Sequence, residues 1–315
     1  MPASPPALSR VPVWVWRALM AHLTPREVRR FNANPLTSVD YTLDLDYVGD
    51  GIREHRLDVI VPKGAPSDGA GLPVYVYFHG GGWTSGDKST LTKYCASQAE
   101  SGMVVVNVNY RRAPRHRMAD MIADASAALH WVGERIADFG GDPRSVIVGG
   151  DSAGGQLAAL VTATTRNAEL AEHYGLEPTP TTRVRGVVQH CAALDFSVIF
   201  ERGFILSTQF VRMLLPAGIA SSAIRAASRY LSPIEWVDPT FPPTLVTTSR
   251  PDPFYRASLN FAAALRRHRV PVEVHVDEDA QHTWQQDSHH PRSADVYARL
   301  QDFVGRVALA PRSVT

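Results

Sequence analysis

A serine lies in a glycine-rich corner, Gly150-Asp151-Ser152-Ala153-Gly154, between a β-branched run that predicts a strand and a small-residue, apolar run that predicts a helix. A G-x-S-x-G sequence in this setting is typical of a nucleophile elbow, in which the serine occupies a strained turn. Gly150 and Gly154 are then required because side chains there would collide with the neighbouring strand and helix. The corner therefore predicts Ser152 as a nucleophile, supported by Gly150, Asp151 and Gly154.

A serine nucleophile that attacks a carbonyl also needs hydrogen-bond donors for the oxyanion that forms. The run 72–78 ends in His79-Gly80-Gly81-Gly82-Trp83, and consecutive glycines let backbone N–H groups approach a carbonyl oxygen. We assign the N–H groups of Gly81, Gly82 and Ala153 to this oxyanion hole, with His79 and Gly80 as supporting motif residues. The alternatives are a plain glycine-rich turn or a phosphate cradle, and no G-K-[ST] follows to support a P-loop.

The serine further needs a base, and in this architecture the chain order is serine, acid, histidine. Of the twelve histidines, His282 follows the last predicted strand, and Asp252 follows the strand before it. Both positions lie at the carboxyl ends of parallel strands, where ligands bind in open α/β sheets. We therefore predict His282 as the general base and Asp252 as its acidic partner.

The elements that must position these residues alternate along the chain. Eight β-branched, apolar runs predict strands at 41–48, 55–61, 72–78, 103–110, 145–150, 185–192, 243–249 and 270–276. The first two alternate apolar with polar residues, which favours antiparallel strands with one exposed face, whereas several later runs are nearly continuous and favour buried parallel strands. Helical stretches separate the later runs, so we expect an α/β fold with a mostly parallel eight-stranded sheet and helices on both faces.

Two further segments are expected to form a helical cap. Residues 1–40 predict an N-terminal helical cap segment, in which Thr24-Pro25-Arg26-Glu27 reads as a capping box with proline at the first helical position. An apolar run before it is broken by Arg17 and is too short to span a bilayer. Within the domain expected at 41–315, residues 196–235 have helical periodicity without a strand, which favours a helical insertion over the carboxyl edge of the sheet.

Composition narrows the function classes. A formal net charge of +1 gives no reason to expect nucleic acid or an anionic membrane as a partner. The two cysteines, Cys95 and Cys191, lie in a predicted helix and strand, so packing is favoured over a disulfide or a metal site, and a cytoplasmic location is expected. The predicted chemistry needs neither a metal nor an organic cofactor.

With these residues in view, the sequence resembles the hormone-sensitive-lipase-like family of α/β-hydrolase carboxylesterases. The matching segments appear in the family's order: HGGGW (79–83), YRRAP (110–114) followed by Asp124, GDSAGG (150–155), SPIEW (232–236), DPFYR (252–256) and QHTW around His282. The resemblance implies Ser152 as nucleophile, His282 as general base and acid, and Asp252 orienting the imidazole. The family usually continues its aspartate motif as D-P-L-x-D-E-G, whereas Phe254, Tyr255 and Arg256 follow Pro253 here, which puts the common family substrates in doubt.

The resemblance implies a serine hydrolase acting on carboxylic esters of small to medium acyl chain. Three alternatives stay open: cleavage of an amide, lactone or aryl ester; acyl transfer or cyclisation with the same triad; and ligand binding without catalysis. Trp83, Phe204, Phe210 and Trp284 are the expected substrate-pocket residues. Arg112, Arg115 and Arg256 are either surface charges or a site for an anionic acyl group, and the last strand is an expected homodimer interface.

Overall fold

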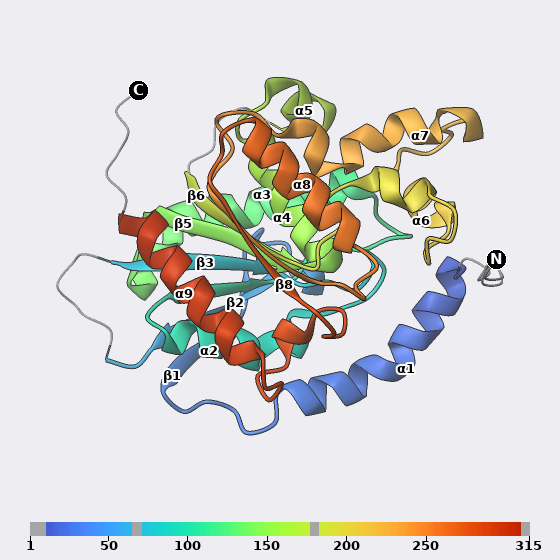
Figure 1. Cartoon of the computed structure of the whole chain (residues 1–315). Helices are drawn as coiled ribbons and strands as arrows, with labels where there is room; N and C mark the ends of the chain where they lie inside the picture. The colour runs from blue at the N-terminus through green and yellow to red at the C-terminus, as the bar shows by residue number, and fades with distance from the viewer. Residues whose placement is uncertain (1–10, 65–70, 177–182, 310–315) are drawn as a thin grey trace.

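One sheet of eight strands organises the computed structural model, which describes residues 11–64, 71–176 and 183–309 (Figure 1). Its spatial order is β1-β2-β4-β3-β5-β6-β7-β8. The strands are β1 (Val39–Asp46), β2 (Arg56–Pro62), β3 (Leu72–Phe78), β4 (Val104–Val108), β5 (Gly141–Asp151), β6 (Val184–His190), β7 (Thr244–Ser249) and β8 (Val272–Asp277). Only β1 with β2 and β2 with β4 pair antiparallel among the described strands. The predicted mostly parallel sheet is confirmed.

The expectation that the second strand has one exposed face is wrong. β2 pairs with β1 and β4 along its two edges, and residues on both of its faces are buried in the apolar layers: Leu57 and Val59 on one face and Ile60 on the other. The polar residue of its alternating pattern, Asp58, is buried as well and accepts a hydrogen bond from Lys88 Nζ at 2.5 Å. An ion pair therefore compensates a carboxylate whose position in the sequence suggested contact with water.

Helices cover both faces of the sheet. They are α1 (Val13–Phe31), α2 (Thr92–Glu100), α3 (Met118–Arg135), α4 (Ser152–Thr164), α5 (Ala168–His173), α6 (Thr208–Leu214), α7 (Ile224–Ala227), α8 (Tyr255–Arg267) and α9 (Ser293–Leu309). In β3, Val74, Val76 and Phe78 belong to the same apolar cluster as side chains of α3, α4 and α8, whereas Tyr75 and Tyr77 belong to the cluster that includes side chains of α2 and α9. This two-residue alternation in a fully buried strand explains the two apolar layers. α9 was not among the predicted helices.

The first helix differs from its prediction. α1 begins at Val13 and continues through Pro25 to Phe31, so Thr24 does not cap a new helix. The Thr24 hydroxyl instead donates to the carbonyl of Met20 at 2.7 Å, which it can do only because Thr24 is already helical. Of the expected segment 1–40, residues 1–10 lie outside the described residues, as do residues 310–315 of the expected domain 41–315. Among the helices described, none has the length and apolar character needed to cross a membrane.

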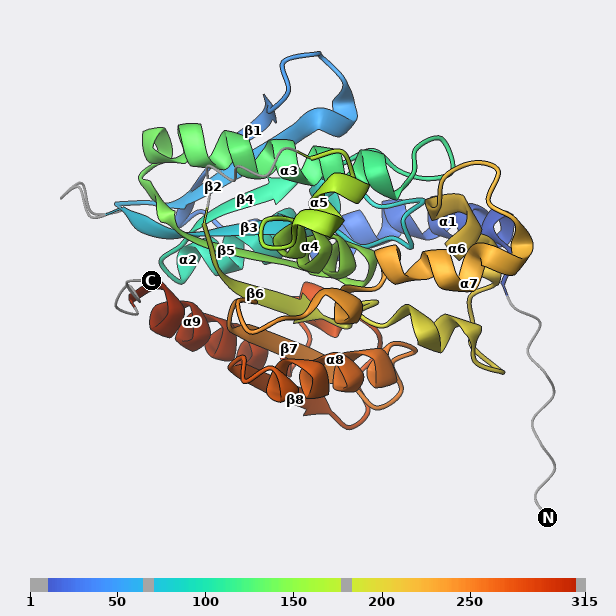
Figure 2. The ribbon, with the colours of Figure 1, turned by 90° about the horizontal axis from the view of Figure 1, so that it is seen from above.

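The segment 196–235 forms short helices and no strand in its described structure, as predicted. Figures 1 and 2 both show α6 and α7 at the same end of the sheet as the first turns of α1. Val11 pairs with Leu206 in an isolated bridge, and the rings of Trp16 and Phe210 meet edge to face at 6.3 Å. The N-terminal segment and the insertion are therefore packed against each other.

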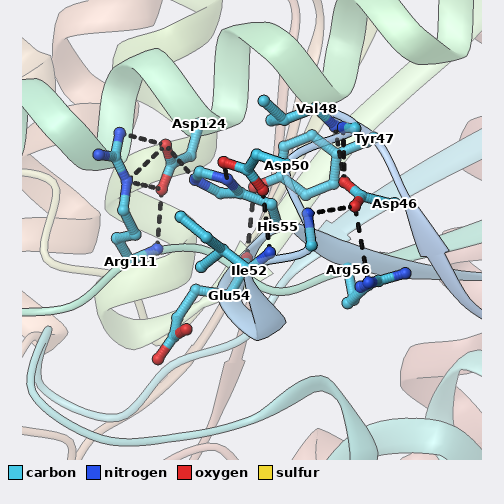
Figure 3. Close-up of polar contacts among 12 residues, drawn as sticks. Asp46, Tyr47, Val48, Asp50, Ile52, Glu54, His55, Arg56, Arg111 and Asp124 are labelled. Carbon is cyan, nitrogen blue, oxygen red and sulfur yellow. Dashed lines mark hydrogen bonds and ion pairs between the residues drawn. The ribbon is translucent and has the colours of Figure 1, made fainter.

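A buried ion-pair network joins the β1–β2 hairpin to α3 (Figure 3). Figure 3 shows Asp124 of α3 between Arg111 and His55. Its carboxylate accepts from the Arg111 guanidinium at 2.6 Å and from the Arg111 backbone N–H at 2.8 Å, and it lies 3.2 Å from His55 Nε2. His55 Nδ1 in turn lies 2.8 Å from Asp50. Arg111 of the YRRAP segment and Asp124, which follows that segment, thus hold together elements that are distant in sequence.

Candidate active site

Ser152 occupies the sharp turn that joins β5 to α4. Its φ of 50° lies in the left-handed region, which is strained for a residue with a side chain. A Cβ at Gly150 would collide with the carbonyl oxygen of Phe78, and one at Gly154 with the carbonyl oxygens of Phe78 and His79. These are backbone atoms of the neighbouring strand and loop and have little freedom to move. The glycines flanking Ser152 are therefore required, as the sequence predicted.

A chain of short polar contacts runs from Asp252 through His282 to Ser152. His282 Nε2 lies 3.1 Å from Ser152 Oγ, and His282 Nδ1 lies 2.5 Å from Asp252 Oδ2. The other carboxylate oxygen of Asp252 accepts from the N–H of Phe254 at 2.6 Å, which holds the acid in place. The structure brings the three predicted residues together from the ends of β5, β7 and β8.

The electrostatic surroundings of His282 in this series of contacts favour the charged form of its imidazole. Burial lowers the pKa of His282, but the hydrogen bond and negative charge of Asp252, with a smaller effect of Asp151, outweigh burial and raise that pKa above its ordinary value. Asp252 has a fully buried side chain, whereas the His282 side chain is 33% exposed. A base with a raised pKa beside a serine hydroxyl is able to take up and return a proton near neutral pH.

Asp151 lies directly before the serine and is buried. Burial raises its pKa to about 6, although hydrogen bonds from the Tyr77 hydroxyl and the Gly80 N–H oppose this effect. Those bonds measure 2.8 and 2.9 Å. Asp151 therefore connects the glycine-rich loop after β3 to the serine turn after β5. This contact positions the loop relative to the serine.

The glycine-rich loop lies beside Ser152. Gly81 and Gly82 have φ values of 122° and 59°, and no described residue accepts a hydrogen bond from the N–H of either. Ala153 lies in the first turn of α4, where backbone N–H groups have no partner within the helix. His79 is buried and stacks on Tyr110, with ring centroids 4.6 Å apart, and its Nδ1 contacts the Gly80 carbonyl at 2.8 Å. The loop thus presents unpaired donors next to the serine.

A cavity of about 210 Å³ opens onto Ser152 and His282. Helix α1, the glycine-rich loop with the turn after it, the serine corner and the segment after His282 all contribute to its walls. The lining residues are Trp16, Met20, Thr24, Glu27, His79, Gly80, Gly81, Gly82, Gly86, Asp87, Thr90, Leu91, Asp151, Ser152, His282, Thr283 and Gln286. Apart from Trp16, Met20 and Leu91, its side chains are mostly polar.

The four aromatic residues expected to line the pocket do not line this cavity. Phe210 is fully buried between the rings of Trp16 and Trp83, and the Trp83 indole donates to Gln156 Oε1 at 2.8 Å. Phe204 packs on Phe254 at 5.6 Å between ring centroids, and Trp284 is buried. These side chains are engaged in packing of the insertion against the sheet and α1 and are not among the lining residues of this cavity.

None of the three arginines considered as an anion site is among the lining residues of the cavity. Arg112 donates to the carbonyl of Gly86 and contacts Glu54, Arg256 pairs with Glu201 at 2.6 Å, and Arg115 is exposed. No lysine or arginine occurs among the described lining residues, so the cavity offers no cationic side chain to an anionic acyl group.

Cys191 contacts the loop that carries His282, which the sequence did not reveal. It follows β6 with a φ of 49°, and its sulfur accepts from the N–H of Thr283 at 3.4 Å, directly after His282. Burial raises the pKa of its thiol, and the nearby Asp252 charge adds to this effect. Ligand atoms of Cys191, Asp252 and His282 lie within 4.8 Å of one another, but an ion there would displace the Asp252 contact to His282. The sulfur is therefore best described as a support for the histidine loop.

Comparison with known proteins agrees with this geometry. Residues 75–286 match the alpha/beta hydrolase fold family. The chain belongs to this family. The match includes the glycine-rich loop and the serine corner, and it extends past His282, so the resemblance predicted from HGGGW and GDSAGG is confirmed at the level of the family.

Two relatives of this alpha/beta hydrolase come from Mycobacterium tuberculosis. This chain is 31% identical over 214 residues to the carboxylic ester hydrolase LipN and 33% identical over 211 residues to the carboxylesterase NlhH. These alignments cover 66% and 64% of this chain but only 56% and 63% of the relatives. The matched part thus spans less than two thirds of either relative.

Solved structures share the fold of this alpha/beta hydrolase over nearly its whole length. Esterase B of Lactobacillus rhamnosis, solved with a tributyrin phosphonate inhibitor, superimposes with a TM-score of 0.82 at 22% identity and covers 97% of both chains. An esterase of the archaeon Pyrobaculum calidifontis gives a TM-score of 0.69 at 24% identity, with 94% of both chains covered. At these identities the likeness concerns the fold.

Proposed function

We propose that this protein is a serine hydrolase that cleaves carboxylic esters of small to medium acyl chain through an acyl-enzyme intermediate. The observation that carries the proposal is the contact chain from Asp252 through His282 to Ser152 at the turn between β5 and α4. Relatives named carboxylic ester hydrolase and carboxylesterase support it. The size of the cavity, about 210 Å³, supports a small substrate, because pockets for drug-sized ligands hold roughly 300–1,000 Å³.

In the proposed mechanism, His282 Nε2 takes the proton of Ser152 while Oγ attacks the ester carbonyl. The developing oxyanion accepts hydrogen bonds from the N–H groups of Gly81, Gly82 and Ala153, each such donor being worth about 2.7–4 kcal/mol in related sites. His282 then gives its proton to the departing alcohol, and water repeats the sequence on the acyl-enzyme. Asp252 keeps the imidazole in the tautomer that points its free nitrogen at the serine.

We further propose that α1 and the helices of 196–235 act as the cap over this site, with 1–40 as a cap segment and 41–315 as the hydrolase domain. The contacts of Val11 with Leu206 and of Trp16 with Phe210 support this division. The Trp16 indole also donates to the Gly81 carbonyl at 3.5 Å, so the cap touches the oxyanion loop directly.

We also propose that the protein forms a homodimer and is located in the cytoplasm. β8 is one of the two edge strands of the described sheet, which supports a homodimer formed by pairing of β8 with its copy in a second chain. Both cysteines are free and buried, which supports the cytoplasmic location expected from the sequence.

The test is hydrolysis of p-nitrophenyl acetate, butyrate, octanoate and palmitate by the purified protein and by a Ser152→Ala variant of confirmed folding. We expect turnover that falls with chain length and is lost in the variant. Equal rates for the two proteins on every ester would overturn the proposal. Addition of an amine or alcohol acceptor, with analysis of the products, separates hydrolysis from acyl transfer.

A further inference from the structure

One stripe of α1 forms a wall of the cavity that contains Ser152. Trp16, Met20, Thr24 and Glu27 all line it, and their spacing of four, four and three residues places them on a single helix face. A Cβ on Gly82 would lie 2.7 Å from the Trp16 indole nitrogen, so this stripe is in close contact with the glycine-rich loop. The side chains of this stripe therefore face any group bound beside the serine.

Glu27 is the charged member of this stripe, and its carboxylate has no hydrogen bond or ion pair with any described residue. The nearest basic side chain on its helix, Arg30, is 66% exposed and pairs instead with Asp287 at 3.7 Å. Burial raises the pKa of Glu27, and the charge of Arg30 opposes this only in part. A half-buried carboxylate without a partner is costly unless a ligand compensates it.

Besides the backbone N–H groups of the glycine-rich loop, two residues of the cavity wall, His79 and Thr90, have a side-chain polar atom without a partner. His79 Nδ1 contacts the Gly80 carbonyl and so carries the proton, which leaves the buried Nε2 as an unpaired acceptor. Burial lowers the pKa of His79 to about 4, so this ring is neutral at pH 7. The Thr90 hydroxyl is buried without a partner and can accept or donate.

The remaining charged groups of the wall are acidic or belong to the proposed triad. Asp87 is engaged by Arg53 at 3.0 Å and by the Ser89 N–H, and Asp151 by Tyr77 and Gly80. His282 faces Asp252 and is neutral in the form that accepts a proton from Ser152. The described wall thus presents negative charge to a ligand, with no lysine or arginine among its lining residues.

We propose that Glu27 is a specificity residue that binds a cationic group, so that the protein prefers esters carrying a protonated or quaternary amine close to the scissile bond. This inference rests on the proposed hydrolase function. Glu27 acts by binding this group and takes no part in proton transfer. Its carboxylate gains a counter-ion when such a substrate enters.

The test compares substrates of equal shape that differ in charge. Acetylcholine and 3,3-dimethylbutyl acetate place the cation in the alcohol part, and ethyl 3-aminopropanoate and ethyl butanoate place it in the acyl part. In Glu27→Gln, we expect the ratio of kcat/KM for cationic over neutral ester to fall about tenfold in at least one pair. Glu172→Gln, an exposed glutamate on α5 outside the cavity, should leave both ratios unchanged.

Retained turnover of the neutral esters by Glu27→Gln shows that the variant is folded. Unchanged ratios in both pairs, with that turnover retained, would overturn the role of Glu27. A binding experiment distinguishes failure of the Glu27 proposal from failure of the proposed hydrolase function. Calorimetry measures binding of acetylcholine and of 3,3-dimethylbutyl acetate to the Ser152→Ala variant and to the double variant Ser152→Ala, Glu27→Gln. A charge preference that depends on Glu27 in this experiment supports the inference even if p-nitrophenyl esters are not cleaved, whereas equal binding of the two esters counts against it.

Discussion

Asp252 holds the imidazole of His282 through a single contact of 2.5 Å, and its own position depends on the N–H of Phe254. Asp252→Asn keeps this shape but exchanges an acceptor for a donor at the imidazole, which favours the wrong tautomer. We expect kcat for ester hydrolysis to fall about 10⁴-fold with the fold intact. Steady-state kinetics beside circular dichroism of the variant measure both effects, and a loss below about tenfold would contradict the role of Asp252.

The pH dependence follows from the same contact. Hydrolysis needs neutral His282, so kcat/KM should fall as pH drops through the raised pKa of His282, above its usual 6.5. Asp252→Asn removes the charge that raises this pKa while burial continues to lower it. Its acid limb should therefore lie at lower pH than that of the wild type. Profiles of kcat/KM between about pH 5 and 9 test this, and a limb that moves to higher pH would refute the assignment.

At the scale of elements, the serine turn depends on close approach of β3, β5 and α4. Gly154→Ala places a methyl group against the carbonyl oxygens of Phe78 and His79, neither of which is the end of a flexible side chain. We expect a loss of about 3 kcal/mol in the free energy of unfolding, together with loss of esterase activity. Urea denaturation and p-nitrophenyl acetate turnover are the measurements.

Gly305→Ala in α9 is the matched control, because nothing lies within 4 Å of the added Cβ and the position is helical. This change should stabilise the protein by about 0.5–1 kcal/mol, since alanine is the better helix former. If the two alanine variants had similar stability, the steric account of the serine corner would be wrong.

At the scale of the whole molecule, Asp124 connects α3, the segment after β4 and the β1–β2 hairpin (Figure 3). Asp124→Ala leaves Arg111 and the buried His55 without their shared partner. We expect the free energy of unfolding to fall by about 3 kcal/mol, because breaking a buried ion pair leaves a charge uncompensated. Asp138→Ala breaks an exposed pair with Arg135 and should cost only about 0–1 kcal/mol. Equal losses in the two variants would disprove a special role for the buried network.

The proposed homodimer is also a property of the whole molecule. Sedimentation velocity should show a dimer for the wild type, and Val276→Lys on the edge strand β8 should give a monomer because lysine disfavours pairing at a sheet edge. A wild-type monomer at assay concentrations would exclude the dimer. Esterase activity of the variant verifies that it is folded.

Much of the fold and of the candidate site followed from local patterns. The eight strands were predicted because β-branched apolar runs are recognisable without knowledge of their partners. The grouping of Ser152, Asp252 and His282 was predicted because each follows a strand, and the carboxyl ends of parallel strands share one edge. The glycines around Ser152 are likewise a local requirement of a tight turn.

The tertiary structure alone decided which side chains face the cavity. The sequence could not show that α1 continues through Pro25 and turns Glu27 toward the serine, or that Phe204, Phe210 and Trp284 are taken up in packing. It also could not place β2 inside the sheet or Cys191 beneath the histidine loop. A residue's type and spacing determine the element that it forms, whereas the face that meets a cavity is set by contacts between segments far apart in the chain.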